Sequence, residues 1–240
     1  MSVLQWDKEG TVAIITMSNA ENRQNPVFVD TFLTILDDVE KDGSAGAVVV
    51  ISDDGKHWSL GIDLPWVMEK IGAGKTAEVK TFLKRLNDLF IRLLTYPMPV
   101  IAAISGHSFG GGAIMACACD FRLMRSDRGF FCFPEIDVGI PFLPGMTAMM
   151  KRVFPGNILN HMVLTGSRLT AAELEKGGVV MKACPDGKTL REESLTFGGA
   201  FAKGRSIFSA IKKGMNKDVI AVIERDDPPF IESFGLLARP

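Results

Sequence analysis

Residues 97–141 read PMPVIAAISGHSFGGGAIMACACDFRLMRSDRGFFCFPEIDVGIP, and this stretch decides the fold. Residues 100–104 form a short apolar run typical of a buried strand, and residues 111–119 are apolar enough for a buried helix. A glycine-rich turn joins the two. This strand, turn and helix fit two different catalytic arrangements, one built on Ser108 and the other on Glu135, and the rest of the chain has to discriminate between them.

The first arrangement takes residues 106–110, GHSFG, as the G-x-S-x-G nucleophile elbow of an α/β-hydrolase. The catalytic acid and the histidine must then follow the serine along the chain. Of the three histidines only His161 follows Ser108, and it lies in a segment that reads as a helix rather than as a late loop. No HGGG-type segment precedes the serine. We therefore interpret Ser108 as a small residue in a tight turn, His107 as a turn or packing residue, and His57 as a surface-loop residue.

The composition is that of a packed α/β enzyme. With 240 residues, 47% hydrophobic residues, 24 glycines and 12 prolines, the chain suits one large domain or a domain with an appendage, and wholesale disorder is excluded. We expect a core of residues 1–190 followed by a helical segment of residues 191–240. A formal net charge of −1 argues against a broad basic face for nucleic acid or an anionic membrane.

Residues 93–119 carry no formal charge, and this run is long enough to raise the question of a membrane span. Pro97, Pro99, His107 and the glycines at 110–112 argue against a spanning helix, so a buried strand and a buried helix explain the run better. The N-terminus lacks the pattern of a secretory signal, and the C-terminal LLARP is not a peroxisomal tripeptide of the S-K-L kind. We expect a cytoplasmic protein.

The cysteines show no C-x-x-C spacing; they are Cys117, Cys119, Cys132 and Cys184. Cys117 and Cys119 are two residues apart on a predicted helix, so they do not share a face. We expect all of them to be reduced and buried, and we expect no metal site.

Strands and helices alternate in the first part of the chain. Residues 11–17 and 47–51 have the composition of strands, and residues 25–41 repeat apolar side chains at helical spacing, with Pro26 suited to a first helical turn. A strand, a helix and a strand in this order predict a parallel pair joined by a crossover. Residues 76–94 predict an amphipathic helix.

Further along, residues 121–124 predict a strand. Thr170 and Glu173 form a capping box that opens another helix. The C-terminal segment is helical in pattern and more charged, and we expect Pro228 and Pro229 to break its helix late.

Four blocks of sequence occur in a set order. They are the strand and helix that end at residue 51, the loop SLGIDL at 59–64, the stretch PVIAAISGHSFGGG at 99–112, and PEIDVG at 134–139. In this order they resemble the crotonase superfamily, the enoyl-CoA hydratase/isomerase group, and the resemblance covers about residues 3–185. It implies an α/β fold, a spiral of ββα units, with C-terminal helices that help to assemble trimers.

The resemblance also implies an oxyanion hole. When a proton leaves the carbon beside a thioester carbonyl, the enolate oxygen needs preorganised donors, which here are the backbone N–H groups of Ile62 and Gly111. Gly111 lies at an expected helix N-terminus, where the dipole favours negative charge. Removing one such donor typically costs about 3 kcal/mol of barrier. We also expect Asp63 to cap the helix after its loop. The substrate-binding residues that the resemblance implies are Leu60, Gly61, Asp63, Gly110 and Ile114.

Glu135 falls on one of the family's two catalytic glutamate positions, whereas the other position, three residues after Gly111, holds Ile114. Adding water across a double bond is best served by two carboxylates. Moving a double bond from C3–C4 to C2–C3 needs one base, which takes a proton from C2 and returns it at C4. An apolar pocket walled by Phe131, Phe133 and Ile114 would raise the pKa of Glu135 and suit it to this shuttle. The chain thus resembles the single-glutamate Δ3,Δ2-enoyl-CoA isomerases.

Alternative functions remain open from the sequence. The same oxyanion hole suits hydration, decarboxylation or hydrolysis of an acyl-CoA. The missing second glutamate argues against hydration and leaves the other two reactions open. Ester hydrolysis through Ser108 and a catalytically silent acyl-CoA-binding subunit are further alternatives. The resemblance implies an acyl-CoA substrate that itself carries the CoA, no separate cofactor or metal, no nucleic-acid or membrane partner, and a homotrimer or dimer of trimers assembled through residues 191–240.

Overall fold

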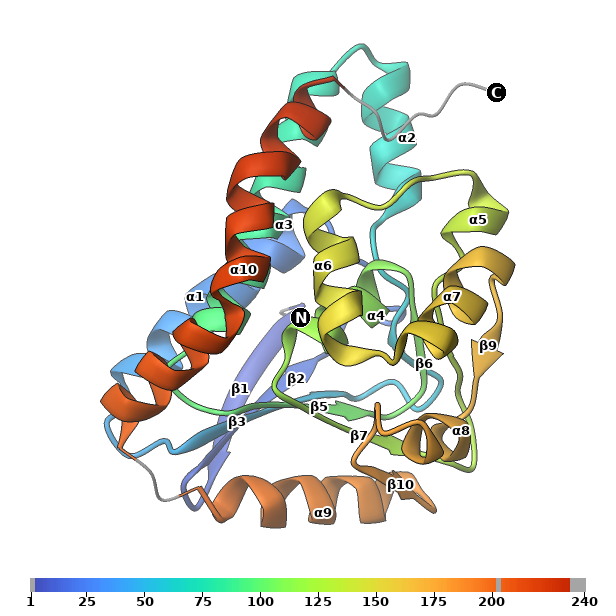
Figure 1. The fold of residues 1–240 in the computed structure, drawn as a ribbon. Helices are drawn as coiled ribbons and strands as arrows, with labels where there is room; N and C mark the ends of the chain where they lie inside the picture. Colours follow the sequence, from blue (N-terminus) through green and yellow to red (C-terminus); the bar gives the residue numbers. More distant parts are fainter. Residues whose placement is uncertain (1–2, 202–203, 234–240) are drawn as a thin grey trace.

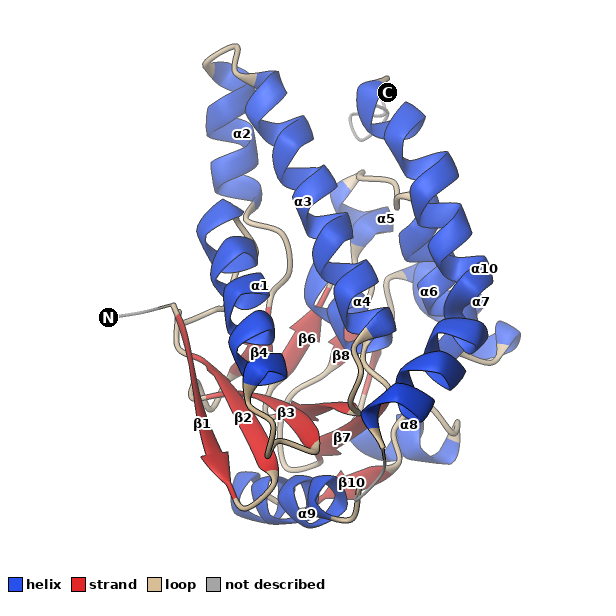
Figure 2. Ribbon diagram, turned by 90° about the vertical axis from the view of Figure 1, so that its left-hand side faces the viewer, coloured by secondary structure: helices blue, strands red, loops and turns tan. Residues whose placement is uncertain are grey.

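The structure is a computed structural model that describes residues 3–201 and 204–233. Its strands form two sheets, and helices cover both faces of the larger sheet (Figures 1 and 2). The strands are β1 (Leu4–Glu9), β2 (Val12–Met17), β3 (Ala47–Ser52), β4 (His57–Ser59), β5 (Val100–Ile104), β6 (His107–Phe109), β7 (Phe121–Arg125), β8 (Phe131–Cys132), β9 (Arg168–Leu169) and β10 (Lys182–Cys184). The helices are α1 (Pro26–Lys41), α2 (Leu64–Gly72), α3 (Thr76–Thr95), α4 (Gly111–Ala118), α5 (Glu135–Val138), α6 (Pro144–Val153), α7 (Gly156–Thr165), α8 (Ala171–Lys176), α9 (Gly187–Gly199) and α10 (Arg205–Glu232).

The first sheet has the strand order β1-β2-β3-β5-β7-β10. β1 pairs antiparallel with β2, and the other neighbours are parallel. Because α1 joins β2 to β3, the predicted strand, helix and parallel strand are confirmed. Asn25 caps α1 by accepting a hydrogen bond from the N–H of Phe28, and Pro26 begins the helix.

The two faces of this sheet are buried against different helices, because successive side chains of a strand point to opposite faces. The face toward α9 packs against Leu190 of that helix in a small apolar cluster, to which the strands contribute Val12, Val49, Ile101, Ala103, Leu123 and Cys184. The opposite face joins the main core, with Ile15, Val48 and Val50 among its members. Figures 1 and 2 show α9 beneath the sheet and α1, α3 and α10 above it.

The second sheet has the short strands β4-β6-β8-β9. β6 pairs in parallel with β4 and with β8, whereas β9 is antiparallel to β8. The chain leaves β4 into the loop of residues 60–63, leaves β6 into α4, and leaves β8 toward α5. Because these three strands are parallel, the three segments emerge at the same edge of the sheet, and this edge holds the candidate site.

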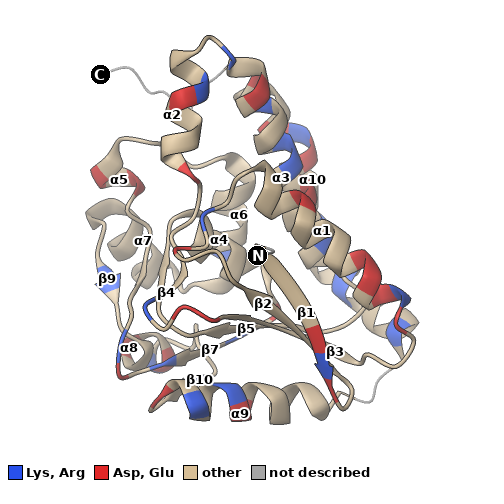
Figure 3. Cartoon of the chain, turned by 180° about the vertical axis from the view of Figure 1, so that it is seen from behind, with Lys and Arg blue, Asp and Glu red and all other residues tan. Residues whose placement is uncertain are grey.

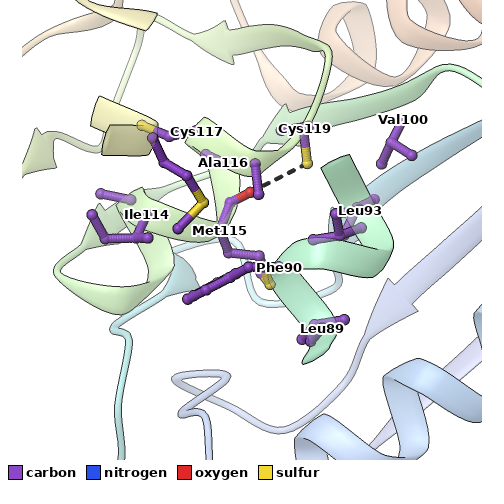
Figure 4. Packing of buried hydrophobic residues seen from close by; sticks show 14 of the residues in the cluster. Leu89, Phe90, Leu93, Val100, Ile114, Met115, Ala116, Cys117 and Cys119 are labelled. Atoms are coloured by element: carbon purple, nitrogen blue, oxygen red, sulfur yellow. Dashed lines mark hydrogen bonds between the residues drawn. The ribbon is translucent and has the colours of Figure 1, made fainter. Parts of the chain in front are cut away.

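Helix α4 lies in the core, since every residue from Gly111 to Ala118 is buried. Figure 4 shows Met115 of α4 beside Phe90 of α3, and Ile114 and Leu93 belong to the same core cluster. Figure 3 shows charged residues along the outer helices α1, α3 and α9. The uncharged run of residues 93–119 therefore contains the buried strand β5 and the buried helix α4. Among the described residues, no helix has the length and hydropathy that a membrane crossing needs.

Several predicted elements are confirmed. α3 covers the expected amphipathic helix, and β7 the strand expected at residues 121–124. Thr170 and Glu173 form the complete capping box at the start of α8. The four cysteines are free and buried, as expected.

The predicted break at Pro228 and Pro229 is wrong, because α10 continues through both prolines. Each proline removes the N–H donor that would bond the carbonyl oxygen four residues before it, so two backbone bonds of the helix are lost. Ile231 is fully buried, and the N–H of Ser233 donates to the carbonyl oxygen of Pro229 at 3.0 Å. Packing and this bond hold the last turn.

Two polar residues lie in strands where a turn and a loop were expected. Ser108 is the fully buried central residue of β6 rather than a turn residue. His57 begins β4 rather than lying in a surface loop, and its Nδ1 is 2.8 Å from Oδ2 of Asp54. His107 is a packing residue, as expected: its Nδ1 accepts a hydrogen bond from the N–H of Phe130, and the two rings stack. Pairing between strands far apart in sequence produces these positions.

The C-terminal part of the chain packs on both sides of the first sheet. The boundary expected at residue 190 lies inside α9, which contacts β3, β5 and β7. α10 lies along α3 and α6. The division into a core of residues 1–190 and an assembly segment of residues 191–240 stays a prediction.

Candidate active site

Two glycine-containing segments meet where β4 and β6 end. The φ angles are +77° at Gly61 and +51° at Gly110, a region that favours glycine. A Cβ on Gly61 would lie 2.5 Å from the nitrogen of Gly111 and 2.8 Å from the carbonyl oxygen of Phe109. The two backbones approach this closely because no side chain stands between them.

This approach brings two backbone donors together. Gly111 is the first residue of α4, so its N–H has no acceptor within the helix. The N–H of Ile62 points away from Gln24, because Gly61 and Asp63 on either side make the hydrogen bonds of that bridge. In the part of the chain that the structure describes, neither N–H has an acceptor. A Cβ on Gly111 would lie 3.1 Å from the nitrogen of Ile62, so the two donors are neighbours.

Glu135 begins α5 beside these donors. Its Oε1 is 3.1 Å from the position that a Cβ on Gly110 would take. Its Oε2 is buried and has no hydrogen-bond partner among the described residues. Burial raises the pKa of Glu135 to about 7, against a smaller opposing contribution from a hydrogen bond with its own backbone. A carboxyl group with such a pKa gives and takes protons readily at neutral pH.

Glu135 lies between two cavities. The smaller, of about 90 Å³, is lined by Leu60, Ile62, Leu64, Gly110, Gly111, Pro134, Glu135, Val138 and Ile140. The larger, of about 390 Å³, is lined by Glu135, Ile136, Gly139, Ile140, Pro141, Phe142, Thr147 and Val163. Glu135 and Ile140 border both cavities. The carboxyl group therefore adjoins the backbone donors on one side and a mainly apolar space on the other.

The structure brings most of the predicted site residues together. Leu60, Ile62, Gly110 and Gly111 border the smaller cavity with Glu135. Gly61 packs against Gly111 behind the donors and does not line either cavity. Asp63 does not line them either. It caps α2, as expected, because its side chain accepts a hydrogen bond from the N–H of Trp66.

Ile114 differs from expectation. It is fully buried in the core and borders neither cavity, and the same holds for Phe131 and Phe133, which were expected to wall the carboxyl group. The segment after Glu135 supplies the walls instead. The chain turns at Gly139, where φ is +68°, and this turn places Ile140 beside the carboxyl group.

Ser108 lacks the surroundings of a nucleophile. Its hydroxyl is fully buried and has no hydrogen-bond partner among the described residues. His161 is exposed on α7. Because a serine nucleophile needs a base within hydrogen-bonding distance, the geometry gives the esterase alternative no support.

Sequence reasoning missed two parts of the site. One is Gln24, which is fully buried next to the two backbone donors. The other is the set of apolar side chains that α5, its following loop and α7 contribute to the larger cavity. Gln24 precedes a helix cap, and a polar residue at such a position is typical of a loop. No local signal in the sequence indicates that the segments around residues 61 and 111 pack against it.

The family follows from comparison with known proteins. The family model described as enoyl-CoA hydratase/isomerase matches residues 7–226. The chain belongs to the enoyl-CoA hydratase/isomerase family. The resemblance to the crotonase superfamily and its fold is thereby confirmed, and the chain is an enzyme of this family.

Relatives within the family have different activities in their names. Enoyl-CoA delta isomerase 3 from Arabidopsis thaliana is 26% identical over 224 residues, which cover 91% of this chain and 94% of that protein. A putative enoyl-CoA hydratase from Thermus thermophilus is 31% identical over 188 residues, which cover 77% of this chain and 72% of that protein. The solved structure of an enoyl-CoA hydratase/isomerase family protein from Pseudomonas syringae has a TM-score of 0.87 at 18% identity, with 96% of this chain and 97% of that chain covered. These similarities establish the family and the fold, and the choice of reaction has to come from the site.

Proposed function

We propose that this enzyme moves the double bond of a 3-enoyl-CoA from C3–C4 to C2–C3. Glu135 takes a proton from C2, the electrons move onto the thioester oxygen as a dienolate, and the same carboxyl group returns the proton at C4. The dienolate oxygen accepts hydrogen bonds from the N–H groups of Ile62 and Gly111. The substrate neither gains nor loses atoms, so one proton shuttle completes the reaction.

The lone carboxyl group between the two cavities carries this proposal. Among the residues that the structure describes, Glu135 is the one acidic residue that borders either cavity. The position that holds a second glutamate in related enzymes is occupied by Ile114, which is buried in the core. One carboxyl group can carry a proton between C2 and C4. Hydration requires more of the site, because a water molecule has to be oriented and its proton has to be exchanged.

The cavities support an acyl-CoA substrate. The thioester carbonyl fits beside Ile62 and Gly111, and the larger cavity offers apolar side chains such as Phe142 and Val163 to the acyl chain. Leu60 and Gly110 then contact the substrate near its thioester. The substrate carries the CoA, so we propose no separate cofactor or metal. The described residues contain no group of three or more His, Cys, Asp or Glu side chains arranged to hold a metal ion.

We also propose that the enzyme assembles as a homotrimer or a dimer of trimers through residues 191–240. Support comes from α10, where Ile207, Ile211 and Met215 are exposed at a spacing that places them on one face. Exposed apolar faces of this kind mark interaction surfaces. The cytoplasmic location stays a prediction.

The test is the ultraviolet absorbance of the purified enzyme with trans-3-hexenoyl-CoA. Isomerisation creates a conjugated 2-enoyl thioester, so its absorption band is expected to grow. Glu135→Gln keeps the shape but removes the base, and we expect a loss of turnover of at least about 100-fold. Asp137→Asn is the matched control, because it neutralises an exposed carboxyl group on the same short helix and is expected to retain turnover.

Hydration is the second candidate, because the Thermus thermophilus relative named as a putative hydratase is 31% identical. Hydration of trans-2-hexenoyl-CoA consumes the conjugated band instead of producing it. Rapid loss of that band, together with no growth from the 3-enoyl substrate, would replace the isomerase proposal with hydration. If acyl-CoA binds and neither change occurs, thioester hydrolysis, decarboxylation or a silent binding subunit remains.

A further inference from the structure

We infer that Gln24 is a positioning residue of the oxyanion hole, which holds the N–H groups of Ile62 and Gly111 at the spacing that a thioester oxygen needs. The inference rests on the proposed function, because it concerns the same two donors. Gln24 precedes α1 and its cap Asn25, far in sequence from both donor segments. In the fold it contacts both of them.

The backbone of Gln24 orients the donor of Ile62. Its N–H donates to the carbonyl oxygen of Gly61 at 2.7 Å, and its own carbonyl oxygen accepts from the N–H of Asp63 at 2.9 Å. The carbonyl of Gly61 and the N–H of Ile62 belong to one planar trans peptide, so they point in opposite directions. Holding that carbonyl toward Gln24 therefore directs the N–H of Ile62 to the other side.

The side chain of Gln24 holds the second donor segment. Its Nε2 donates to the carbonyl oxygen of Gly111 at 3.0 Å and contacts the sulfur of Met115 at 3.8 Å. Its Oε1 is 2.5 Å from the position that a Cβ on Gly111 would take, so the amide also lies against the Cα of that glycine. One residue thus links the segment of Ile62 to the first turn of α4.

Stability alone does not explain a glutamine at this position. Gln24 is fully buried, and its Oε1 has no hydrogen-bond partner among the described residues. A buried polar atom without a partner is unfavourable, and an apolar side chain of similar shape would avoid it. A glutamine that fixes the spacing of two donors gains its advantage in the transition state, where oxyanion geometry controls the rate.

The experiment compares the wild type, Gln24→Met and Asn87→Leu. Methionine matches glutamine in length and removes the amide that donates to the carbonyl oxygen of Gly111. Asn87→Leu removes another buried amide, whose Nδ2 donates to Asp227 at the contact between α3 and α10. Each protein is bound to hexanoyl-CoA labelled with carbon-13 at the thioester carbonyl, a saturated probe that cannot isomerise. The carbonyl stretching frequency, kcat for trans-3-hexenoyl-CoA, KM and thermal unfolding are then measured.

We expect the carbonyl frequency to fall on binding to the wild type, because the donors polarise the carbonyl. In Gln24→Met the shift should be smaller and kcat lower by about 10- to 100-fold, with little change in KM or in the unfolding temperature. Asn87→Leu should keep the full frequency shift and kcat while unfolding at a lower temperature.

Each remaining outcome counts against the inference. If Gln24→Met keeps the wild-type frequency shift and kcat, the side chain of Gln24 does not position the donors and the inference fails, whereas the proposed function stands. If Gln24→Met loses activity only in proportion to a loss of folded protein, the role is structural. If hexanoyl-CoA binds to the wild type without any frequency shift, the oxyanion hole itself is absent and the proposed function fails along with the inference.

Discussion

The environment of each carboxyl group sets what that group can do. Glu135 and Glu173 both lie in the first turn of a helix. Hydrogen bonds from Thr170 lower the pKa of the exposed Glu173, whereas burial raises the pKa of Glu135 to about 7. One side chain is therefore a helix cap, and the other is suited to proton transfer near neutral pH.

The raised pKa of Glu135 predicts how activity depends on pH. The base acts in its ionised form, so kcat/KM for trans-3-hexenoyl-CoA should fall as pH decreases through about 7. One unit below the pKa about a tenth of the carboxyl groups is ionised, so the rate at pH 6 should be roughly tenfold below its plateau. The measurement is kcat/KM from pH 5.5 to about 8.5. A flat profile down to pH 5.5 would show that an unshifted group acts as the base.

At the scale of elements, α2 depends on its first turn because the helix has no fully buried residue. Asp63 accepts hydrogen bonds from the N–H of Trp66 and from Nδ2 of Asn25, both at 3.2 Å. The ring of Trp66 packs edge-on against Phe82 of α3. This small set of contacts fixes α2 directly after the loop that supplies the N–H of Ile62.

Substitutions at Asp63 should separate capping from charge. Asp63→Ala removes the cap and is expected to lower the free energy of unfolding by about 1 kcal/mol, whereas Asp63→Asn keeps an equivalent cap and should change it little. Urea unfolding measures the difference, and hydrogen exchange of the α2 amides shows whether the change is local. Equal destabilisation by Ala and Asn would mean that the negative charge, rather than the cap, matters.

At the scale of the whole molecule, α10 joins distant parts of the chain by packing on α3 and α6. Asp227 is fully buried at this junction. Its carboxyl oxygens accept hydrogen bonds from the N–H of Gly145 at 2.7 Å and from Nδ2 of Asn87 at 2.9 Å. Burial still dominates, and it raises the pKa of Asp227 from 3.8 to about 6.

This raised pKa predicts a loss of stability with increasing pH. Between about pH 4 and 6 the folded state holds the proton of Asp227 more tightly than the unfolded state, so the stabilisation is present at low pH and is lost as pH rises through about 6. Two pKa units correspond to about 3 kcal/mol as an upper limit. Asp227→Asn should therefore raise the free energy of unfolding at pH 8 by about 1–3 kcal/mol and flatten its pH dependence.

Denaturant unfolding at a series of pH values checks this prediction for Asp227→Asn. Asp226→Asn is the matched control, because Asp226 is the adjacent acid and pairs with Arg225 at the surface. A lower stability of Asp227→Asn at pH 8 would show that the ionised carboxylate makes hydrogen bonds worth more than its burial costs.

Local patterns in the sequence were enough to place much of the fold. Asn25 and Pro26 mark the start of α1, the apolar repeat marks α3, and Thr170 with Glu173 marks α8. Such signals depend on neighbours within one or two turns, so they are visible without the fold. They failed at Pro228 and Pro229, where packing of the final turn outweighs the local preference against a helix.

The sequence by itself also determined the family, because four blocks of residues in a fixed order identify the crotonase pattern, and it named Glu135, Ile62 and Gly111. Only the tertiary structure decided what surrounds them. Ile114 lies in the core, Ile140 borders the same two cavities as Glu135, and Gln24 is buried between the two donor segments. The physical reason is that the pKa of a carboxyl group and the spacing of two N–H groups depend on atoms brought together from distant parts of the chain.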